Sequence, residues 1–242
     1  TKPEREYLAS IAKDIVSTLP DNFEYIDLGP GTEHKEQFFF DELKKQHKKF
    51  TYIPVDISKY YLDLAQKHAN NQDILVQPMQ VSFEELPKYL GPTTTPRFLN
   101  LGLTFSNYNP EAILPLLQSI AGTNGFVFIN TQIRERIDMT ALQKVYALDA
   151  SHIADEKLKL IGLDPTQDVT DQTADDSIKV WCTVVRPNDE LTKMGIAPND
   201  KLLVFQSLRY TKESLEMALN AHTKSFQMFD TTSPFIAALI RT

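Results

Sequence analysis

Cysteine is almost absent from this chain of 242 residues, in which Cys182 is the only one. A single thiol excludes an internal disulfide and any metal site built from cysteines alone. Cys182 lies in the apolar run 179–184, where we expect a small buried residue of a strand rather than a nucleophile. This composition fits a reducing compartment, and we expect a cytoplasmic protein.

Histidine is also scarce, and its spacing does not suggest a metal centre. The five histidines are His34, His47, His68, His152 and His222. No HExxH motif and no paired spacing links any two of them, although metal-binding histidines usually carry such a signature. We therefore expect no metal site.

Long apolar runs and an excess of basic charge are both missing. The longest apolar runs fall far below the ~18 residues that span a bilayer. The first five residues include an acid and precede no apolar segment, so no signal peptide is visible, and Thr1 in place of methionine suggests processing or truncation. With 25 basic and 32 acidic residues the net charge is −7. This charge argues against nucleic acid and against an anionic membrane as partners.

The residues that are present favour one large folded domain over residues 1–242. Hydrophobic residues make up 42% of the chain and charged residues 24%. That balance allows a sizeable core and argues against disorder. No internal repeat is evident, so we expect a single domain of an ordinary α/β protein.

Helical and strand-like segments alternate over roughly the first 160 residues. Apolar residues at three- and four-residue spacing predict an N-terminal helix within residues 1–20, which Pro20 ends. Further helices are expected at 35–47, 59–69 (with Ser58 as N-cap), 110–121 and 139–161, and strands at 25–28, 50–56, from 74, 98–101 and 126–129. This alternation predicts βαβ units and a mostly parallel sheet, whose ligands bind at the carboxyl ends of the strands.

The pattern changes after residue 161. Five aspartates punctuate a polar segment that we interpret as a solvated loop, because it lacks the spacing of a calcium loop: Asp164, Asp168, Asp171, Asp175 and Asp176. Two β-rich runs follow at 178–185 and 202–208, then a helix at 212–221 capped by Thr211, and strands at 226–230 and 235–240. Residues 163–210 thus interrupt the repeat, and we expect them to form an inserted β-rich segment over the substrate.

A glycine-containing turn follows the first strand, in the run Asp27–Thr32. Gly29 and Gly31 allow a tight turn and close approach of the backbone to a ligand. Asp56 ends the second strand, where an acid can accept both hydroxyls of a ribose. Together these features predict a nucleotide-type site that includes Gly29, Gly31 and Asp56; a turn followed by a helix-capping aspartate is the alternative.

The kind of nucleotide follows from what this turn lacks. His34 stands where the dinucleotide fingerprint requires its third glycine, which argues against NAD and against a Rossmann oxidoreductase. No Walker-type loop is present, so ATP chemistry is disfavoured. S-adenosylmethionine carries no phosphate, and a looser turn is sufficient for it.

Three segments resemble the motifs of a known family, the histidine-specific, S-adenosylmethionine-dependent methyltransferases. Asp27–Lys35 is similar to its first motif, acid-Leu-Gly-x-Gly-Thr-x-x-Lys. Tyr52–Ser58 resembles Tyr-x-Pro-x-Asp-x-Ser, and Leu101–Tyr108 resembles Leu-Gly-Ser-Thr-Ile-Gly-Asn-Phe. The likeness runs from about Tyr25 to the C-terminus and is most specific up to Tyr108.

The resemblance implies a fold and a reaction. The fold would be the Rossmann-like class I methyltransferase fold, with a mostly parallel seven-stranded sheet and flanking helices. The reaction would transfer a methyl group from S-adenosylmethionine to the amine nitrogen of an amino acid or a similar small molecule. Two alternatives remain open, namely a different small-molecule acceptor and a non-catalytic module that binds S-adenosylmethionine or its demethylated product.

The resemblance also implies which residues would hold the cofactor. Gly29 and Lys35 would contact the methionyl end, and Asp56 would bind the ribose. The family holds the adenine with an Asp-Phe pair, to which Ser82 and Phe83 correspond here. Phe83 can still stack on the adenine, whereas Ser82 is a weaker acceptor for its amino group.

Four further residues would contact the substrate by the same resemblance. Asn107 would grip its amino-acid head, and Tyr146 would contact it and serve as the candidate proton acceptor. The family's Glu-x-Ser-x-Lys-Phe motif corresponds to Phe205–Tyr210, which keeps Ser207 but places Phe205 at the glutamate. An apolar ring cannot accept the imidazole N–H, so a less polar substrate suits Phe205. Capping of the helix near residue 110 is an alternative role for Asn107, and core packing is one for Tyr146.

Overall fold

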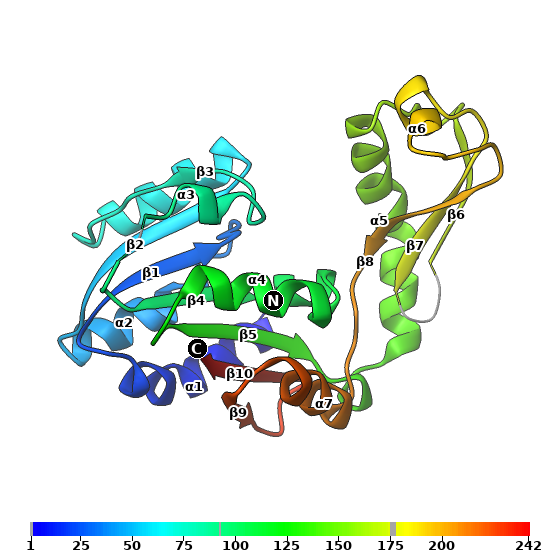
Figure 1. Ribbon diagram of the computed structural model, residues 1–242. Coiled ribbons are helices and arrows are strands. Elements are labelled where there is room, and N and C mark those ends of the chain that lie inside the picture. The colour runs from blue at the N-terminus through cyan, green and yellow to red at the C-terminus, as the bar shows by residue number, and fades with distance from the viewer. Residues whose placement is uncertain (1, 92, 175–177) are drawn as a thin grey trace. The chain divides into compact units, whose positions relative to one another are not determined.

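Seven strands form the central sheet of the molecule, for which a computed structural model describes residues 2–91, 93–174 and 178–242 (Figure 1). Side chains of residues 145, 147–154, 156 and 170–174 are left out of the description, so Asp175, Asp176 and the side chain of Asp171 lie outside it. The strands are β1 (Asn22–Leu28), β2 (Lys49–Asp56), β3 (Met79–Gln80), β4 (Arg97–Gly102), β5 (Phe126–Gln132), β9 (Ser225–Asp230) and β10 (Phe235–Arg241).

The order of these strands is β3-β2-β1-β4-β5-β10-β9. The five strands from β3 to β5 pair in parallel, while β10 runs antiparallel to both β5 and β9. The prediction of a mostly parallel seven-stranded sheet is therefore confirmed. Strand order reverses at β1, which pairs with β2 on one side and β4 on the other, so a ligand crevice is expected at the carboxyl end of β1.

Helices cover both faces of this sheet. Helices α1 (Lys2–Thr18), α2 (Gln37–Lys45) and α3 (Lys59–Asn70) pack on one face, where their apolar residues join a single core cluster with the strands. Helix α4 (Pro110–Ala121) packs on β4 and β5, and α7 (Lys212–His222) packs on α4, across the other face (Figure 1). Thr211 caps α7 as predicted, accepting the N–H of Ser214 at 3.0 Å.

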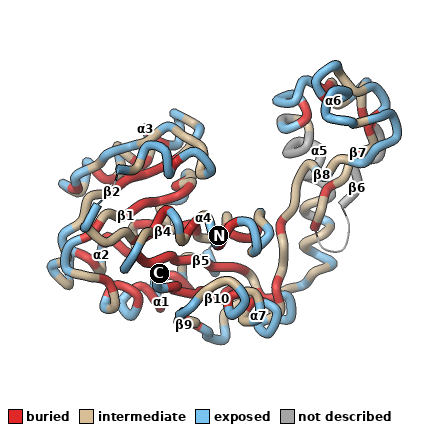
Figure 2. Tube along the Cα trace, in the orientation of Figure 1, coloured by how far each residue is buried: buried red, intermediate tan, exposed pale blue. Residues whose placement is uncertain are grey.

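Aromatic rings fill much of the core beneath α1 and α2. Tyr25 on β1 lies 5.0 Å from Phe98 and 5.8 Å from Phe40 between ring centroids, and both contacts are edge-to-face. Such pairs add about 0.5–1.5 kcal/mol beyond the burial of their area. The central strands β5 and β10 are buried along almost their whole length, as Figure 2 shows. The turn after β1 is thus held on a rigid base.

The described chain divides into two compact units. The first holds the sheet just described and consists of Thr1–Phe105, Asn109–Ile133 and Thr211–Thr242. The second consists of Ser106–Tyr108 and Arg134–Tyr210. It contains residues 163–210, for which a role over the substrate remains a prediction.

The second unit has its own small sheet. Its elements are α5 (Met139–Leu160), β6 (Val169–Ala174), β7 (Lys179–Val184), α6 (Asp189–Lys193) and β8 (Lys201–Gln206), with the three strands antiparallel in the order β6-β7-β8. Alternate residues of β7 are buried, among them Cys182, against a cluster with Leu158 and Leu163. Cys182 is a buried strand residue, as predicted.

Two local predictions need correction. The stretch 164–176 was expected to be a solvated loop, yet residues 169–174 form β6, because an edge strand needs only backbone pairing and tolerates polar residues. The third strand begins at Met79 rather than Ile74, and Val76 makes only an isolated bridge to Tyr52. Ser58 occupies the N-cap of α3 as predicted, although its side chain makes no capping bond.

Across the residues that the structure describes, no helix combines the length and the apolar character that crossing a bilayer requires.

Candidate functional site

The turn after β1 adopts a conformation that needs glycine. Gly29 has φ +74° and Gly31 has φ +64°, in the left-handed region that other residues avoid. The Gly29 N–H donates to the Val55 carbonyl at 2.8 Å, which fixes the turn at the end of β2. A Cβ on Gly29 would lie 3.6 Å from Cζ of Phe83. The turn therefore brings together two of the residues predicted to bind the cofactor.

Asp56 and Ser82 lie next to this turn. Asp56 ends β2, and its Oδ1 accepts the N–H of Ser58 at 2.8 Å. Burial raises the pKa of the half-buried Asp56 carboxyl, and hydrogen bonds from the backbone partly oppose this effect. The N–H of Val81 donates to the Asp56 carbonyl at 3.2 Å, so the loop with Ser82 and Phe83 begins beside the acid.

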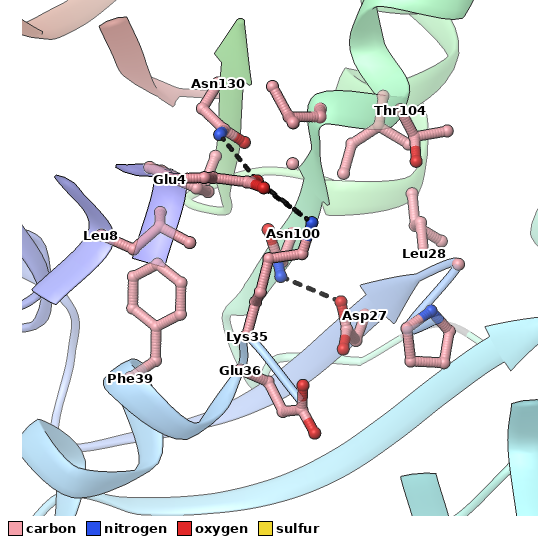
Figure 3. A pocket seen from close by; sticks show the side chains of 16 residues that line it. Glu4, Leu8, Asp27, Leu28, Lys35, Glu36, Phe39, Asn100, Thr104 and Asn130 are labelled. Carbon is pink, nitrogen blue, oxygen red and sulfur yellow. Dashed lines mark hydrogen bonds and ion pairs between the residues drawn. The ribbon is translucent and has the colours of Figure 1, made fainter. Parts of the chain in front are cut away.

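A small enclosed cavity of about 60 Å³ lies beside the Gly29 turn (Figure 3). Lys35 lines it, but its Nζ is 3.1 Å from both carboxylate oxygens of Glu4 and 3.6 Å from Oε2 of Glu33. Glu4 comes from α1, and its side chain is only 2% exposed. The amide of Asn130 donates to Glu4 at 3.4 Å. Lys35 thus lies beside the Gly29 turn, where it forms an ion pair with Glu4.

Two buried amide oxygens in the lining of this cavity have no partner. Oδ1 of Asn100 and Oδ1 of Asn130 accept no hydrogen bond from any described residue. A Cβ on Gly102 would lie 3.3 Å from the Asn130 oxygen and 3.7 Å from the Asn100 oxygen, so the two acceptors converge. An unpaired buried acceptor costs about 1–3 kcal/mol, which a donor on a bound molecule would recover.

Asp27 is the second buried acid of the cavity. Its carboxylate accepts the Tyr52 hydroxyl at 2.7 Å and the Asn100 amide at 2.9 Å. Burial and the nearby charge of Glu36 raise the pKa of Asp27 to about 7, although these hydrogen bonds and Lys35 oppose the shift. With Glu4, Asp27 and Glu36 against one lysine, the lining favours a cationic group such as an ammonium.

The raised pKa of Asp27 makes stability depend on pH. The folded chain holds this proton up to about pH 7, whereas the ordinary carboxyl releases it near 3.8, so the folded form binds more protons between these values. The free energy of unfolding should therefore fall as the pH rises through this window. The free energy of unfolding, measured with urea between pH 5 and 8, should fall less in Asp27→Asn than in the wild type. The surface variant Asp63→Asn should keep the wild-type fall; equal falls in all three proteins would contradict the assignment.

A separate cluster of side chains lies in the second unit. The Tyr146 hydroxyl donates to Oγ of Ser207 at 3.4 Å, and the Arg209 guanidinium donates to Ser207 Oγ at 2.8 Å and to the Tyr146 hydroxyl at 3.3 Å. The rings of Tyr146 and Phe205 stack with centroids 5.8 Å apart. Lys157 Nζ lies 5.0 Å from the centroid of Phe205. Three of the four residues predicted to contact the substrate thus meet, and Tyr146 is more than a core residue.

Asn107 joins this region through its backbone. Its carbonyl accepts Nε2 of Gln206 at 3.1 Å, while its side chain is exposed. The alternative role for Asn107, capping the helix near residue 110, is wrong: Asn109 holds the N-cap of α4. Its assignment to the substrate remains a prediction.

A family comparison decides between the kinds of ligand that these sites can take. The model of the family described as histidine-specific, S-adenosylmethionine-dependent methyltransferases matches residues 1–154. The chain belongs to this family. S-adenosylmethionine is therefore its cofactor, as the turn predicted. The match begins before Tyr25, where the resemblance was expected to start, and it ends before Phe205 and Ser207.

One curated relative and several solved structures are similar to this chain. The N-methyltransferase dtpB of Aspergillus flavus is 37% identical over 70 residues, which are 28% of this chain and 20% of that protein. The chain thus matches only a fifth of the length of this relative. A methyltransferase of Clostridium acetobutylicum has a TM-score of 0.50 at 12% identity, covering 98% of this chain and 91% of that one. The CurJ carbon methyltransferase has a TM-score of 0.57 at 10% identity, covering 97% and 53%. Such likenesses establish the methyltransferase fold alone.

The residues of the first unit fit this cofactor. S-adenosylmethionine carries an ammonium group, and the converging oxygens of Asn100 and Asn130 lack the donors that such a group offers. Gly29 lets the backbone come close to a ligand beside this cavity. Asp56 stands at the end of the next strand, where ribose hydroxyls are bound in this kind of fold.

Sequence reasoning missed four residues of the two sites. Glu4 falls on the apolar stripe of α1, four residues before Leu8, and a charge on such a stripe is itself a signal. Asn100 and Asn130 interrupt otherwise apolar strands. Arg209 stands at the lysine of the family's C-terminal motif and was given no role.

Proposed function

We propose that this chain transfers a methyl group from S-adenosylmethionine to the amine nitrogen of an amino acid or a similar small molecule whose side chain is less polar than imidazole. The observation that carries the acceptor assignment is the cluster of Tyr146, Phe205, Ser207 and Arg209. The similarity to an N-methyltransferase supports nitrogen as the accepting atom.

In this proposal the first unit binds the donor. Gly29, Gly31 and Lys35 contact its methionyl end, Asp56 accepts the ribose hydroxyls, and Phe83 packs on the adenine with Ser82 beside it. Lys35 would bind the carboxylate of the donor while it remains paired with Glu4, whose Oε1 lies 3.1 Å from its Nζ. Bound there, the cofactor supplies an electrophilic methyl group on a sulfonium.

Arg209 gives the acceptor site its polarity. Its guanidinium donates to both hydroxyl oxygens of the cluster and the Tyr146 hydroxyl donates to Ser207, which leaves the Ser207 hydroxyl to offer its proton outward. Nε of Arg209 is buried and has no partner among the described residues. A substrate carboxylate would satisfy this N–H with a charge-assisted hydrogen bond. Asn107 is proposed to add a further contact to the amino-acid head.

Phe205 sets the preference for the substrate side chain. Its ring is stacked on Tyr146 and lies under Lys157, which leaves no carboxylate at the position where the family recognises imidazole. Leaving an imidazole N–H unpaired costs about 1–3 kcal/mol, or roughly a factor of 5–150 in discrimination. An aliphatic or aromatic amino acid incurs no such cost.

The proposed reaction needs a free electron pair on the nitrogen. A protonated amine has none, so the site must remove a proton before the nitrogen can displace the sulfur in line. Tyr146 is proposed to accept this proton as its hydroxyl passes its own proton to Oγ of Ser207, to which it donates at 3.4 Å, and Ser207 releases its proton toward solvent. Positioning the amine opposite the departing sulfur does the remaining work.

The test is methyl transfer from labelled S-adenosylmethionine to a panel of amines. We expect turnover with aliphatic or aromatic amino acids and weak turnover with histidine. Phe205→Glu restores the acid of the family motif and should raise kcat/KM for histidine relative to the best apolar substrate by about tenfold. Binding of S-adenosylhomocysteine without transfer to any amine would overturn the proposal in favour of a non-catalytic binding module. Transfer only to oxygen would indicate another acceptor class.

A cytoplasmic location remains a prediction that rests on the single cysteine and the acidic charge of the chain.

A further inference from the structure

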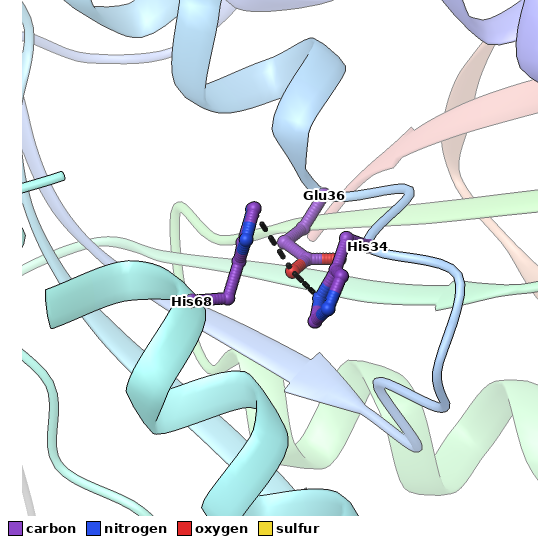
Figure 4. A group of neighbouring side chains, drawn as sticks. All are labelled: His34, Glu36 and His68. Atoms are coloured by element: carbon purple, nitrogen blue, oxygen red, sulfur yellow. Dashed lines mark hydrogen bonds and ion pairs between the residues drawn. The ribbon is translucent and has the colours of Figure 1, made fainter. Parts of the chain in front are cut away.

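Two histidines and a buried glutamate meet beside the turn that follows β1 (Figure 4). Nδ1 of His34 lies 3.3 Å from Oε1 of Glu36, and Nε2 of His68 lies 3.9 Å from the same oxygen. The two imidazole rings stack with centroids 4.0 Å apart. Their ligand atoms and that of Glu36 all lie within 4.8 Å of one another.

From this arrangement we propose that His34, Glu36 and His68 bind a divalent transition-metal ion of the zinc type. Two imidazole nitrogens and one carboxylate are a common ligand set for Zn²⁺, which tolerates a fourth ligand from water. Calcium and magnesium prefer ligand sets made of oxygen, so neither should compete well. The ion would be structural, at the edge of the cavity that Glu36 also lines.

The separations suit such an ion after a small adjustment. Two ligand atoms bound at 2.0–2.1 Å to a tetrahedral ion lie about 3.3 Å apart, which is the distance found between His34 and Glu36. The widest separation in the group, at most 4.8 Å, must shorten by about 1.5 Å. Rotation of the partly exposed imidazoles supplies this movement, because the His34 and His68 side chains are 35% and 24% exposed.

The surroundings favour a cation. The Glu36 side chain is 2% exposed, and a buried carboxylate is costly unless a positive charge lies beside it. A divalent ion held by the two imidazoles would place such a charge directly on the carboxylate. Nε2 of His68 also lies 2.8 Å from Oε1 of Gln37 and 3.0 Å from Nε2 of Gln72, so an ion bound at this nitrogen would replace these two contacts.

A bound ion would join two segments that are distant in the sequence. His34 belongs to the loop after β1, Glu36 precedes α2, and His68 lies in the last turn of α3. His34 adopts φ +49°, which is uncommon for a residue other than glycine, so an ion would hold a strained position in place. The loop also carries Gly29 and Gly31, and the ion would therefore stabilise the base of the cofactor turn.

The experiment measures metal binding by the whole chain after treatment with a chelator. Titration calorimetry with ZnCl2 should show one ion bound at micromolar affinity or tighter, and CoCl2 should produce the visible absorption of a low-coordinate cobalt site. MgCl2 should produce no heat. The melting temperature should rise with zinc.

Three variants test the ligands, and a fourth serves as the control. His68→Ala, Glu36→Gln and His34→Asn, in which asparagine tolerates the positive φ, should each weaken zinc binding by at least about 100-fold. His47→Asn replaces an exposed histidine that follows α2 and also has a positive φ, +56°, and it should bind zinc like the wild type. Circular dichroism and the melting temperature without metal check that each variant is folded. Wild-type affinity in His68→Ala and His34→Asn, or the absence of zinc binding by the wild type, would overturn the proposal. Neither result bears on the methyltransferase assignment.

Discussion

Replacing Asp56 with asparagine is expected to weaken binding of S-adenosylhomocysteine by about 100-fold. The carboxylate offers two acceptor oxygens to a ribose diol, and hydrogen bonds to a charged group contribute about 1.5–3 kcal/mol each. Asparagine keeps one oxygen for the Ser58 N–H, which Asp56 accepts at 2.8 Å, so the start of α3 should remain intact. The loss should therefore fall on the ligand and not on the fold. Titration calorimetry measures the affinity directly.

Asp63→Asn is the matched control for this variant. Asp63 lies on α3 and makes only an exposed ion pair with Lys59 at 2.7 Å, which contributes little to stability. Its replacement should leave both affinity and melting temperature unchanged. If Asp56→Asn binds the ligand as tightly as Asp63→Asn does, Asp56 merely caps the helix and the ribose is bound elsewhere.

Secondary structure could be predicted where the spacing of apolar residues agrees with residues that typically start or end a helix. The helix at residues 110–121 was predicted with the bounds of α4, because Pro110 starts it and Gly122 follows its end. The prediction failed where backbone pairing alone decides. Residues 169–174 are polar, and only their register with β7 makes them a strand. The pattern of a single sequence does not reveal which strand a polar segment will pair with.

The cofactor site was predictable for the same reason that the fold was. Its turn and its strand-end acid lie within two successive βα units, so local order along the chain places them together. Glu4 comes from α1 and Asn130 from β5, and only the assembled sheet brings them to Lys35. The same holds for His34 and His68, whose spacing follows no metal-binding motif although their rings stack.

Phe205 stands where the family motif has a glutamate, and we propose that this difference changes the preferred substrate. The family match covers residues 1–154, so three residues of the proposed acceptor cluster lie outside it, namely Phe205, Ser207 and Arg209. Phe205 packs on Tyr146 instead of presenting a charge, yet Ser207 and a basic residue at 209 are kept. A site of this kind can lose its preference for imidazole while it retains the groups that position an amine.

Tyr146→Phe is expected to lower kcat by about 100-fold at neutral pH if the hydroxyl accepts the proton of the amine. The variant keeps the ring that stacks on Phe205 at 5.8 Å, so the local packing should survive. Affinity for S-adenosylhomocysteine should not change, because Tyr146 belongs to the second unit and the proposed donor site to the first. Single-turnover measurements with labelled donor separate the chemical step from binding.

The pH profile distinguishes this role from a merely structural one. As the pH approaches the pKa of the substrate amine, a growing fraction arrives already deprotonated, so the defect of Tyr146→Phe should shrink. A loss of positioning would instead persist at every pH. Tyr89→Phe, which alters an exposed tyrosine, provides the control and should follow the wild-type profile. A Tyr146→Phe defect that stays constant across the profile would mean that the hydroxyl positions the amine and does not accept its proton.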